Sequence, residues 1–266
     1  MMENIKKLRS QTGCGVSDCK QALDESNGDI EKAIEILRKK GIAKAAKRND
    51  REACQGVIKL AVSDDHKEGY IAEINAETDF VVRNEKFQEF ANQILEIVKT
   101  QKPDDREALL DLPMAQGTVK DNLENLSGTI GEKLDIKRCA VLSSSGTVAA
   151  YSHANGSIGV LVALDQAGKD ELAYNIAMHI AASNPVYIAP EDVGQAEIDK
   201  EKEVYQEQMR QEGKPDEIIE KIMHGKINKY FEDVCLIKQE YIKDDKQKVE
   251  NILNDVKVEK FIRYSL

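Results

Sequence analysis

Apolar residues in the first fifty positions recur at the spacing of short helices. Three segments carry such a stripe, and the clearest one falls at i, i+3, i+4 and i+7: Ile30, Ala33, Ile34 and Leu37. A stripe of this kind on a short helix needs other helices to cover it. The pattern therefore predicts a small unit of three helices, which with the linker after it occupies residues 1–52.

Polar residues and glycines indicate where these helices begin and end. Two glycines in the segment 12–15 favour a sharp turn after the first helix. Ser17 or Asp18 is a good N-cap for the second helix, and Asn27 with Gly28 is typical of its C-terminal end.

The third helix is expected to begin after Asp29, which is another good N-cap. Residues 41–51 then form a basic stretch without interleaved aromatic residues. Between two folded units, such a stretch indicates a solvated hinge.

From Ala53 onward the pattern changes to the alternation that is typical of strands. The segments 56–63 and 69–77 are apolar or alternating and flank a polar turn, which predicts an antiparallel hairpin. Asn84 is a good N-cap for a helix that continues to about Thr100 and packs on the hairpin.

A similar order recurs further along the chain. Residues 139–152 and 157–165 have strand character, and a helix is expected from about Lys169 to Ala182. This repetition indicates two related subdomains, each an antiparallel sheet backed by helices, so the expected fold class is α+β. We expect the first over residues 53–142 and the second over two segments, 143–194 and 233–266. Gly69 with Ile71 and Gly156 with Ile158 are expected to occupy matching places.

A long charged segment interrupts the second subdomain. Residues 195–232 carry a sparse apolar stripe at the spacing that lets two helices pair, and Gly213 with Pro215 reverses the chain. The sequence therefore predicts an inserted antiparallel helical hairpin. The remaining elements are expected after it: strands at 235–243 and 258–266 and a short helix near 249–253.

Composition narrows the classes of function. The 266 residues are 41% hydrophobic and 32% charged, with a formal net charge of -10, whereas a grip on phosphate backbones needs a basic face. We expect no direct nucleic-acid partner. No run approaches the roughly 18 apolar residues of a membrane span, and the first ten residues lack the apolar core of a signal peptide. We expect a cytoplasmic protein without membrane contact.

The chain also lacks the constellations that carry covalent chemistry. Its five cysteines are scattered without CxxC spacing and its four histidines are unclustered, which argues against a disulfide framework and a metal site. Motifs for phosphate loops, zinc hydrolases and serine nucleophiles are absent. We expect no enzyme activity, no cofactor and no bound metal.

The segment 77–81 is the main candidate for function, because an acid and an aromatic stand side by side where a strand gives way to a polar loop. Phe80 would then point outward as a wedge. The structural alternative is that Thr78 or Asp79 satisfies backbone donors while Phe80 packs in the core. These residues by themselves leave both interpretations open.

Two segments together resemble bacterial elongation factor Ts: residues 9–41, RSQTGCGVSDCKQALDESNGDIEKAIEILRKKG, and residues 77–81, ETDFV. The resemblance extends along the chain through GEKLDIKR (131–138), YSHANGSIGVLV (151–162), HIAASNPVYI (179–188) and LIKQEYIKDD (236–245). It implies that the N-terminal helices form a bundle like the ubiquitin-associated fold and dock on a partner's nucleotide-binding domain, through residues that the sequence does not name.

Members of that family are guanine-nucleotide exchange factors for elongation factor Tu, and the resemblance implies the same role here. The chain would bind the GDP form of this GTPase and promote release of magnesium and GDP in the elongation phase of protein synthesis. The residues implied at the contact are Thr78, Asp79, Phe80 and Val81. Two further contacts are implied, His153 and His179, although His179 also fits a core histidine in an apolar helix face.

The family carries the same helical insertion, whose role is either in oligomer or partner contacts or only that of an exposed, stiff hairpin. Whether a homodimer forms in the complex stays open. A helical module that the family often adds has no counterpart after residues 258–266, so its contacts are not expected here. The alternative function is a ribosome- or RNA-associated scaffold without exchange activity, which the basic stretch favours and the acidic balance opposes.

Overall fold

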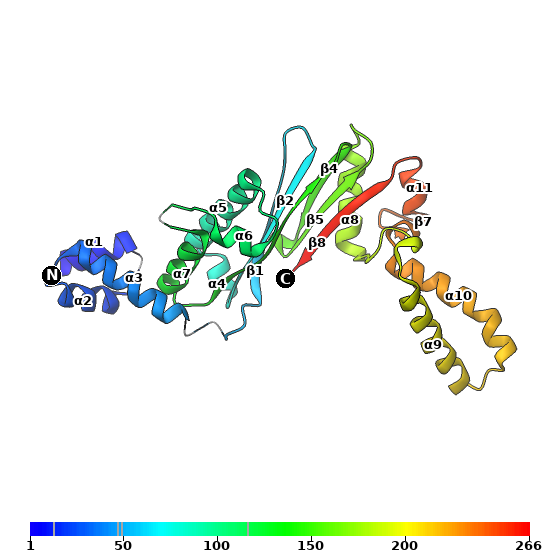
Figure 1. Ribbon diagram of the computed structural model, residues 1–266, viewed down its shortest axis with the longest axis horizontal. Coiled ribbons are helices and arrows are strands. Elements are labelled where there is room, and N and C mark those ends of the chain that lie inside the picture. The colour runs from blue at the N-terminus through cyan, green and yellow to red at the C-terminus, as the bar shows by residue number, and fades with distance from the viewer. Residues whose placement is uncertain (13, 47, 49, 116) are drawn as a thin grey trace.

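Two small antiparallel sheets form the middle of an elongated molecule, with a helical unit at either end (Figure 1). The computed structural model describes residues 1–12, 14–46, 48, 50–115 and 117–266. The N-terminal helices lie at one end, and a helical hairpin projects from the other. Within the described part of the chain, no helix is long and apolar enough to cross a membrane.

The N-terminal unit contains α1 (Met2–Thr12), α2 (Val16–Glu25) and α3 (Ile30–Ala46). Their apolar stripes meet in one cluster: Ile5, Leu8, Cys19, Ala22, Leu23, Ala33 and Leu37. The predicted turn residues are confirmed, since Asn27 and Gly28 have φ of 54° and 83°. Asp29 caps α3 by accepting the Lys32 N–H at 3.1 Å.

The predicted cap of α2 is wrong. This helix begins at Val16, so Ser17 and Asp18 already lie inside its first turn. The residue at the cap is Gly15, in an extended conformation and without a side-chain hydrogen bond. With φ -60° and ψ 151° its backbone is in a conformation open to any residue, and the helix starts two residues earlier than the polar side chains indicate.

The hinge prediction is also wrong for residues 41–46, because α3 continues through Ala46. The reason is a close contact with α7 (Val119–Ile130) of the first sheet layer. A Cβ at Gly128 would lie 2.6 Å from the Cα of Gly41, so the two helix backbones touch where both residues are glycine. Arg48 adds a hydrogen bond to the Ser127 carbonyl at 3.4 Å. Of the predicted hinge, Lys47 and Asn49 lie outside the described residues.

The first sheet has the order β1–β2–β3. Its strands are antiparallel: β1 (Gln55–Val62), β2 (Glu68–Ala76) and β3 (Leu134–Ser143). The helices of this layer are α4 (Asp79–Val82), α5 (Glu85–Gln101), α6 (Arg106–Asp111) and α7. Phe87, Ile94 and Val98 of α5 are fully buried against the sheet. The predicted hairpin and the helix capped by Asn84 are therefore confirmed, with the Lys86 N–H on Asn84 Oδ1 at 3.0 Å.

The second sheet has the order β4–β5–β8 and is covered by α8 (Asp170–Ser183). Its strands are β4 (Thr147–His153), β5 (Ile158–Leu164) and β8 (Val258–Ser265). The segment 139–152 was expected as one stretch of strand character that opens the recurring order, although the boundary between the subdomains was predicted after residue 142. It is divided: residues 139–143 belong to β3 of the first sheet. A turn at 144–146 carries the chain from one sheet to the other.

The segment 235–243 is not the strand that was expected. It forms a short 3₁₀ helix, η3 (Leu236–Lys238), followed by the two-residue strand β6 (Glu240–Tyr241). This strand pairs with β7 (Asp244–Lys248), which the charged sequence DDKQK did not reveal. The helix α11 (Val249–Leu253) is confirmed. Two more 3₁₀ turns lie in the loops of this half: η1 (Ala154–Gly156) and η2 (Pro190–Asp192).

The two sheets pack against each other through an apolar layer: Ile58, Ile71, Leu142, Val148, Leu161, Ala163 and Tyr264. Glycines allow the close approach. A Cβ at Gly159 would lie 2.4 Å from Cγ2 of Ile58, and one at Gly69 would lie 2.9 Å from Cγ1 of Val148. Both are the second residue of the middle strand of their sheet. The residue that corresponds to Gly69 is thus Gly159, and the match predicted with Gly156 is wrong.

A buried charge ties the same two sheets together. Glu73 in β2 is fully buried and accepts a hydrogen bond from Arg138 Nε at 2.6 Å. The Arg138 guanidinium lies 4.0 Å from the centre of the Tyr264 ring in β8 and donates to the Ser265 carbonyl at 3.2 Å. A buried carboxylate needs such a partner, and here the partner also contacts the second sheet.

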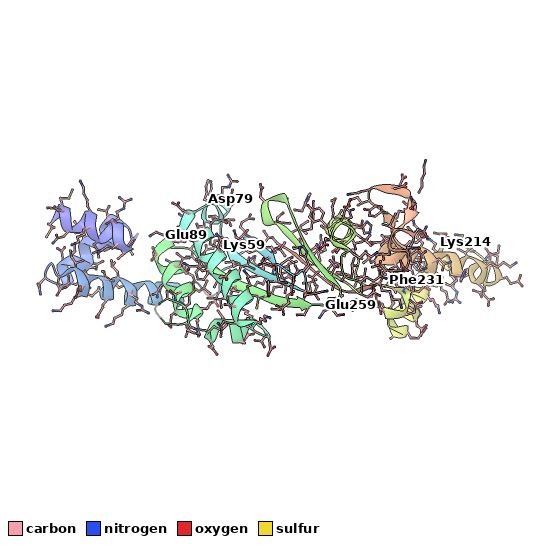
Figure 2. All side chains as sticks on the ribbon, turned by 90° about the horizontal axis from the view of Figure 1, so that it is seen from above. Lys59, Asp79, Glu89, Lys214, Phe231 and Glu259 are labelled. Carbon is pink, nitrogen blue, oxygen red and sulfur yellow. The ribbon has the colours of Figure 1, made fainter. Side chains whose placement is uncertain are left out.

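The hairpin consists of α9 (Gln195–Gln211) and α10 (Asp216–Val234), as predicted. Met209, Ile219 and Ile227 are buried between the helices. Figure 2 places Lys214 at the far tip, away from the sheets. At the base, Glu197 accepts hydrogen bonds from the hydroxyls of Tyr187, at 2.6 Å, and Tyr230, so one carboxylate joins both helices to the loop after α8.

The contact between the sheets generates a first prediction. In Gly159→Val the new side chain meets Ile58, and we expect the free energy of unfolding to fall by about 1–3 kcal/mol, the usual cost of overpacking. Urea unfolding followed by circular dichroism measures it. The control is Gly225→Ala in α10, where nothing lies within 4 Å and stability should rise by about 0.5–1 kcal/mol. Unchanged stability of Gly159→Val would contradict the tight sheet contact.

Candidate functional site

The segment 77–81 forms a helical turn rather than the predicted polar loop. The turn α4 (Asp79–Val82) begins two residues after β2, with Thr78 as its N-cap. Thr78 has an extended backbone, with φ -128° and ψ 155°, and its Oγ1 accepts the Val81 N–H at 3.4 Å. The prediction that Thr78 satisfies a backbone donor is confirmed.

Phe80 and Val81 are neighbours in sequence but lie on different faces of the turn, one exposed and the other buried. Val81 is 7% exposed and belongs to the core of the first sheet layer, whereas Phe80 is 79% exposed. Adjacent residues of a helix lie on different faces, so anchoring Val81 turns Phe80 outward. The outward orientation of Phe80 is confirmed, and its alternative interpretation as a core residue is wrong.

Asp79 lies at the start of this turn and is also accessible. Its Oδ2 accepts from Arg83 Nη2 at 2.9 Å, and the two side chains are 48% and 78% exposed. Figure 2 shows Asp79 at the edge of the molecule beside the first sheet. Exposed ion pairs of this kind contribute about 0.2–1 kcal/mol. Replacement of Arg83 by another cation as the partner of Asp79 therefore costs little free energy.

The turn also borders a groove that reaches the N-terminal helices. Phe80 and Val81 line one side of it, together with 84–86 at the start of α5. The other sides are formed by Arg9 with Ser10 of α1 and by Thr129 with Ile130 of α7. The outward-pointing phenylalanine and the N-terminal unit therefore face a common opening. We call residues 78–82 the wedge turn.

Reciprocal hydrogen bonds between two segments, 77–78 and 132–133, hold the wedge turn in place. Glu132, between α7 and β3, accepts the Thr78 N–H on Oε2 at 3.1 Å and lies 3.0 and 3.1 Å from Thr78 Oγ1. In the opposite direction, Glu77 Oε1 accepts the Lys133 N–H at 2.5 Å. This hydrogen bond, followed by one from Arg51, lowers the pKa of Glu77. We call Glu77, Thr78, Glu132 and Lys133 the carboxylate clamp.

His153 lies at the end of β4 and is exposed. Its Nδ1 is 3.1 Å from the Tyr151 hydroxyl, and the two rings stack with their centroids 6.0 Å apart. Tyr151 in turn meets Tyr174 of α8 edge to face at 5.6 Å. The three rings form an accessible aromatic surface on the second sheet layer, so His153 is available for a contact.

His179 is in the opposite situation, since its side chain is fully buried. Its Nδ1 accepts the Ile242 N–H at 3.3 Å, which leaves the proton on Nε2 to donate to Gln239 Oε1 at 3.0 Å. The core-histidine interpretation is confirmed. A direct contact between His179 and a partner is contradicted, because no part of the ring reaches the surface.

The comparisons with known proteins agree with one another. A family model described as Elongation factor TS matches residues 77–266. Elongation factor Ts of Chlorobaculum tepidum is 41% identical over 280 residues, which cover 99% of this chain and 97% of the relative. This chain belongs to the elongation factor Ts family. Its relative from Halothermothrix orenii is 42% identical over 273 residues, 100% of this chain and 91% of that protein. The one from Nautilia profundicola is 44% identical over 252 residues, with shares of 91% and 82%.

The family resemblance drawn from the sequence is thus confirmed, but the sequence did not reveal the carboxylate clamp. GEKLDIKR was one of the motifs that carried the resemblance to elongation factor Ts. The local structural role of this motif depends on a contact between Glu132 and Thr78, which are 54 positions apart. The available signal was the order of strands, since Glu77 follows β2 and Glu132 precedes β3. Only the pairing of β2 with β3 brings the two ends together.

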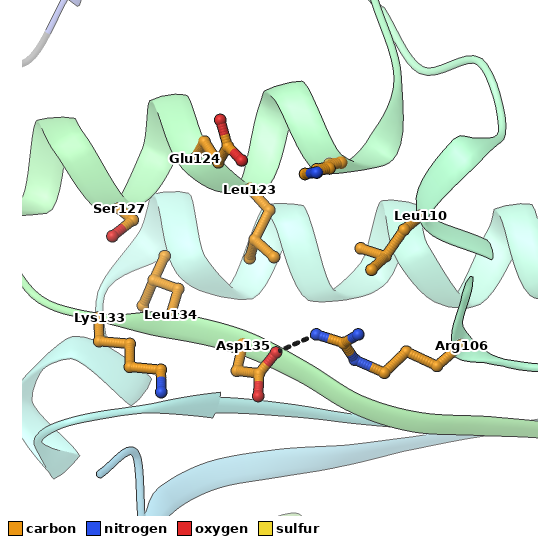
Figure 3. A pocket seen from close by; sticks show the side chains of 9 residues that line it. Arg106, Leu110, Leu123, Glu124, Ser127, Lys133, Leu134 and Asp135 are labelled. Carbon is orange, nitrogen blue, oxygen red and sulfur yellow. Dashed lines mark hydrogen bonds and ion pairs between the residues drawn. The ribbon is translucent and has the colours of Figure 1, made fainter. Parts of the chain in front are cut away.

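A pocket lies on the other side of the clamp, between α6, α7 and the start of β3 (Figure 3). Ser127, Lys133 and Leu134 line it near the clamp, and Arg106 forms an ion pair with Asp135 at 2.9 Å across it. This ion pair joins α6 to the start of β3. Among the described residues, no group of three or more His, Cys, Asp or Glu side chains is arranged to hold a metal ion.

Burial lowers the pKa of His179, and this generates a second prediction. The unfolded chain gains a proton below pH about 6.5, where the folded chain stays neutral at this residue. The free energy of unfolding should therefore decrease as the pH falls below about 6.5, by up to about 1.4 kcal/mol per pH unit.

Urea unfolding between pH 7.5 and 5 measures this dependence. His179→Gln should flatten it, because the titrating group is gone, while His224→Gln in the exposed part of α10 should retain it. An identical pH dependence of the free energy of unfolding with and without His179 would contradict the assignment.

Proposed function

We propose that this chain is a guanine-nucleotide exchange factor that acts on elongation factor Tu in the elongation phase of protein synthesis. Membership of the elongation factor Ts family supports the class of function and the partner. The observation that carries the mechanism is Phe80, a large apolar side chain 79% exposed on a turn that the core and the carboxylate clamp hold in place. Exchange is a change in non-covalent binding, so no group on this chain has to perform a chemical reaction.

The proposed target of the wedge turn is the nucleotide site of the GTPase. Such a site holds GDP through a phosphate loop and a magnesium ion that demands near-octahedral geometry and keeps several waters. Small displacements of the supporting backbone therefore weaken it. In the proposal, Phe80 enters an apolar pocket between helices of the GTPase and Asp79 disturbs the surroundings of the ion. Magnesium leaves first and GDP follows.

The remaining residues of the wedge turn have supporting roles in this proposal. Val81 anchors the turn through the core, and Thr78 closes it by capping. Asp79 is accessible because only an exposed ion pair with Arg83 engages it. Coupling between two ligands is reciprocal, so a factor that weakens nucleotide binding is itself released when a new nucleotide binds. One turn then serves both halves of the cycle.

The proposal assigns the other parts of the chain as follows. Residues 1–52 dock on the nucleotide-binding domain, supported by the groove that the wedge turn shares with α1. Residues 53–142 carry the wedge, while 143–194 with 233–266 form a related subdomain that offers His153 to another domain of the GTPase. His179 supports that second surface from inside. The hairpin 195–232 makes further partner contacts or joins two copies in the complex. The place of action is the cytoplasm, where translation occurs.

Release of a fluorescent GDP analogue from purified elongation factor Tu, with magnesium present, tests the proposal. The unmodified chain should accelerate release. Phe80→Ala should lose about tenfold to a hundredfold of this activity, because burial of one phenylalanine contributes about 1.5–3 kcal/mol.

The control is Ile242→Ala, which shortens another exposed apolar side chain on the second half of the molecule and should retain full activity. Phe80→Ala should unfold at the same temperature as the unmodified chain, since the side chain contributes little to the core. Full exchange activity of Phe80→Ala would remove Phe80 from the mechanism. No acceleration by the unmodified chain would contradict the proposed function itself.

A further inference from the structure

The wedge turn is too short to be stable as a helix in isolation. Its helical part, α4, contains four residues, whereas isolated helices below about 12–15 residues are marginal in water because nucleation is costly. A turn that moved freely in the unbound chain would have to be ordered at the moment of binding, and that ordering weakens association. Something outside the turn must therefore hold it.

The helix α4 lacks a capping box, the interaction that often stabilises the first turn of a helix. In a capping box, the side chain at the third helical position accepts the backbone N–H of the N-cap residue. Elsewhere in this chain α7 has such a box, in which Asp121 accepts the Thr118 N–H at 2.8 Å. In α4 the third position is Val81, which is buried and has no acceptor. The wedge turn uses this position for anchoring, so the cap must come from elsewhere.

Glu132 supplies the missing acceptor from a different segment. Its Oε2 takes the Thr78 N–H at 3.1 Å, and its carboxylate also takes the Thr78 hydroxyl at 3.0–3.1 Å. These are the two groups that a capping box would engage at the N-cap. Hydrogen bonds to an ionised carboxylate are stronger than those between neutral groups.

Glu132 is itself held by its surroundings. Its carbonyl accepts from Ser127 Oγ at 2.6 Å, at the end of α7. The next residue, Lys133, donates its N–H to Glu77, the residue before Thr78. Gly131, with φ of 91°, ends α7 and turns the chain toward the clamp. The carboxylate therefore reaches Thr78 from a fixed base rather than from a free loop.

We propose that Glu132 is a positioning residue for nucleotide exchange: it completes the cap of the wedge turn from outside and keeps Phe80 in the orientation that enters the partner. This inference rests on the proposed function for its consequence in exchange, but not for the ordering of the turn. Glu132 acts through Thr78, and Asp79 with Phe80 makes the contact. Glu132 changes only the fraction of free molecules in which the wedge turn has the conformation that can bind the partner.

This role has a kinetic signature. When the competent conformation is only partly populated, the apparent dissociation constant rises by the inverse of that population, while the fully bound complex is unchanged. For Glu132→Ala we expect the concentration of this chain that gives half-maximal GDP release to rise about tenfold, with the maximal release rate retained. For Glu132→Gln we expect a half-maximal concentration between those of the unmodified chain and Glu132→Ala, because the glutamine amide keeps one acceptor for the Thr78 N–H.

Hydrogen exchange of the free chain tests the same role without any partner. In Glu132→Ala the hydrogen-bonded amides of Thr78, Val81 and Val82 should exchange about tenfold faster, while those of α5 keep their protection. The matched control is Glu124→Ala, which removes a carboxylate from α7 without touching the wedge turn. Thr78→Val removes the hydroxyl alone and should shift both readouts in the same direction as Glu132→Ala. Because the same hydroxyl caps Val81, Glu132→Gln rather than Thr78→Val serves as the test if Glu132→Ala does not fold.

Unchanged protection of the Thr78, Val81 and Val82 amides in Glu132→Ala would overturn the proposal. A lower maximal release rate at an unchanged half-maximal concentration would also overturn it, since that pattern indicates a direct role in the bound complex. If the unmodified chain does not accelerate release, the proposed function fails. The exchange of these amides then still decides whether Glu132 orders the turn.

Discussion

The pairing of β2 with β3 is the interaction on which both the core and the candidate site depend. The middle strand β2 is buried along nearly its whole length, and its last residue, Ala76, pairs with Leu134, the first residue of β3. This register brings the exit from one strand beside the entry to the next. The segments that follow and precede these residues, Glu77 with Thr78 and Glu132 with Lys133, then lie within hydrogen-bond reach of each other. A shift of the register by one residue would place the four groups out of contact.

The exposed phenylalanine also fits the energetics of this arrangement. Leaving such a side chain in water sacrifices stability that burial would provide, about 1.5–3 kcal/mol. The neighbouring Val81 compensates locally, because it is buried in the core and holds the turn in place. The apolar surface at Phe80 is therefore presented by a folded, anchored element, and burial against a partner requires little reorganisation.

Much of the fold was predictable because the signals are local. Asp29 and Asn84 cap the helices they were expected to cap, and Gly213 with Pro215 separates the two helices of the hairpin. The errors come from contacts between distant segments. Gly41 is a poor helix residue by itself, but its contact with Gly128 makes it part of α3. The segment 139–152 contains two strands of different sheets, and nothing local distinguishes their partners. For the site, the residues of segment 77–81 left the orientation of Phe80 open and only the family resemblance favoured the outward one, whereas the clamp needed the strand order.

The uninterrupted α3 has a consequence for how the N-terminal unit is placed relative to the wedge turn. Its 17 residues form one helix about 25 Å long, in which Leu37 packs in the N-terminal core and Gly41, four residues later, contacts α7 next to the clamp. The N-terminal unit is therefore joined to the first sheet layer by a continuous helix, and this helix sets the distance between the unit and Phe80. In the proposed complex, a GTPase whose two complementary surfaces lie at another distance, as in a different nucleotide state, would contact only the N-terminal unit or only Phe80. The dimensions of the chain would then select one conformation of the partner without a separate recognition residue.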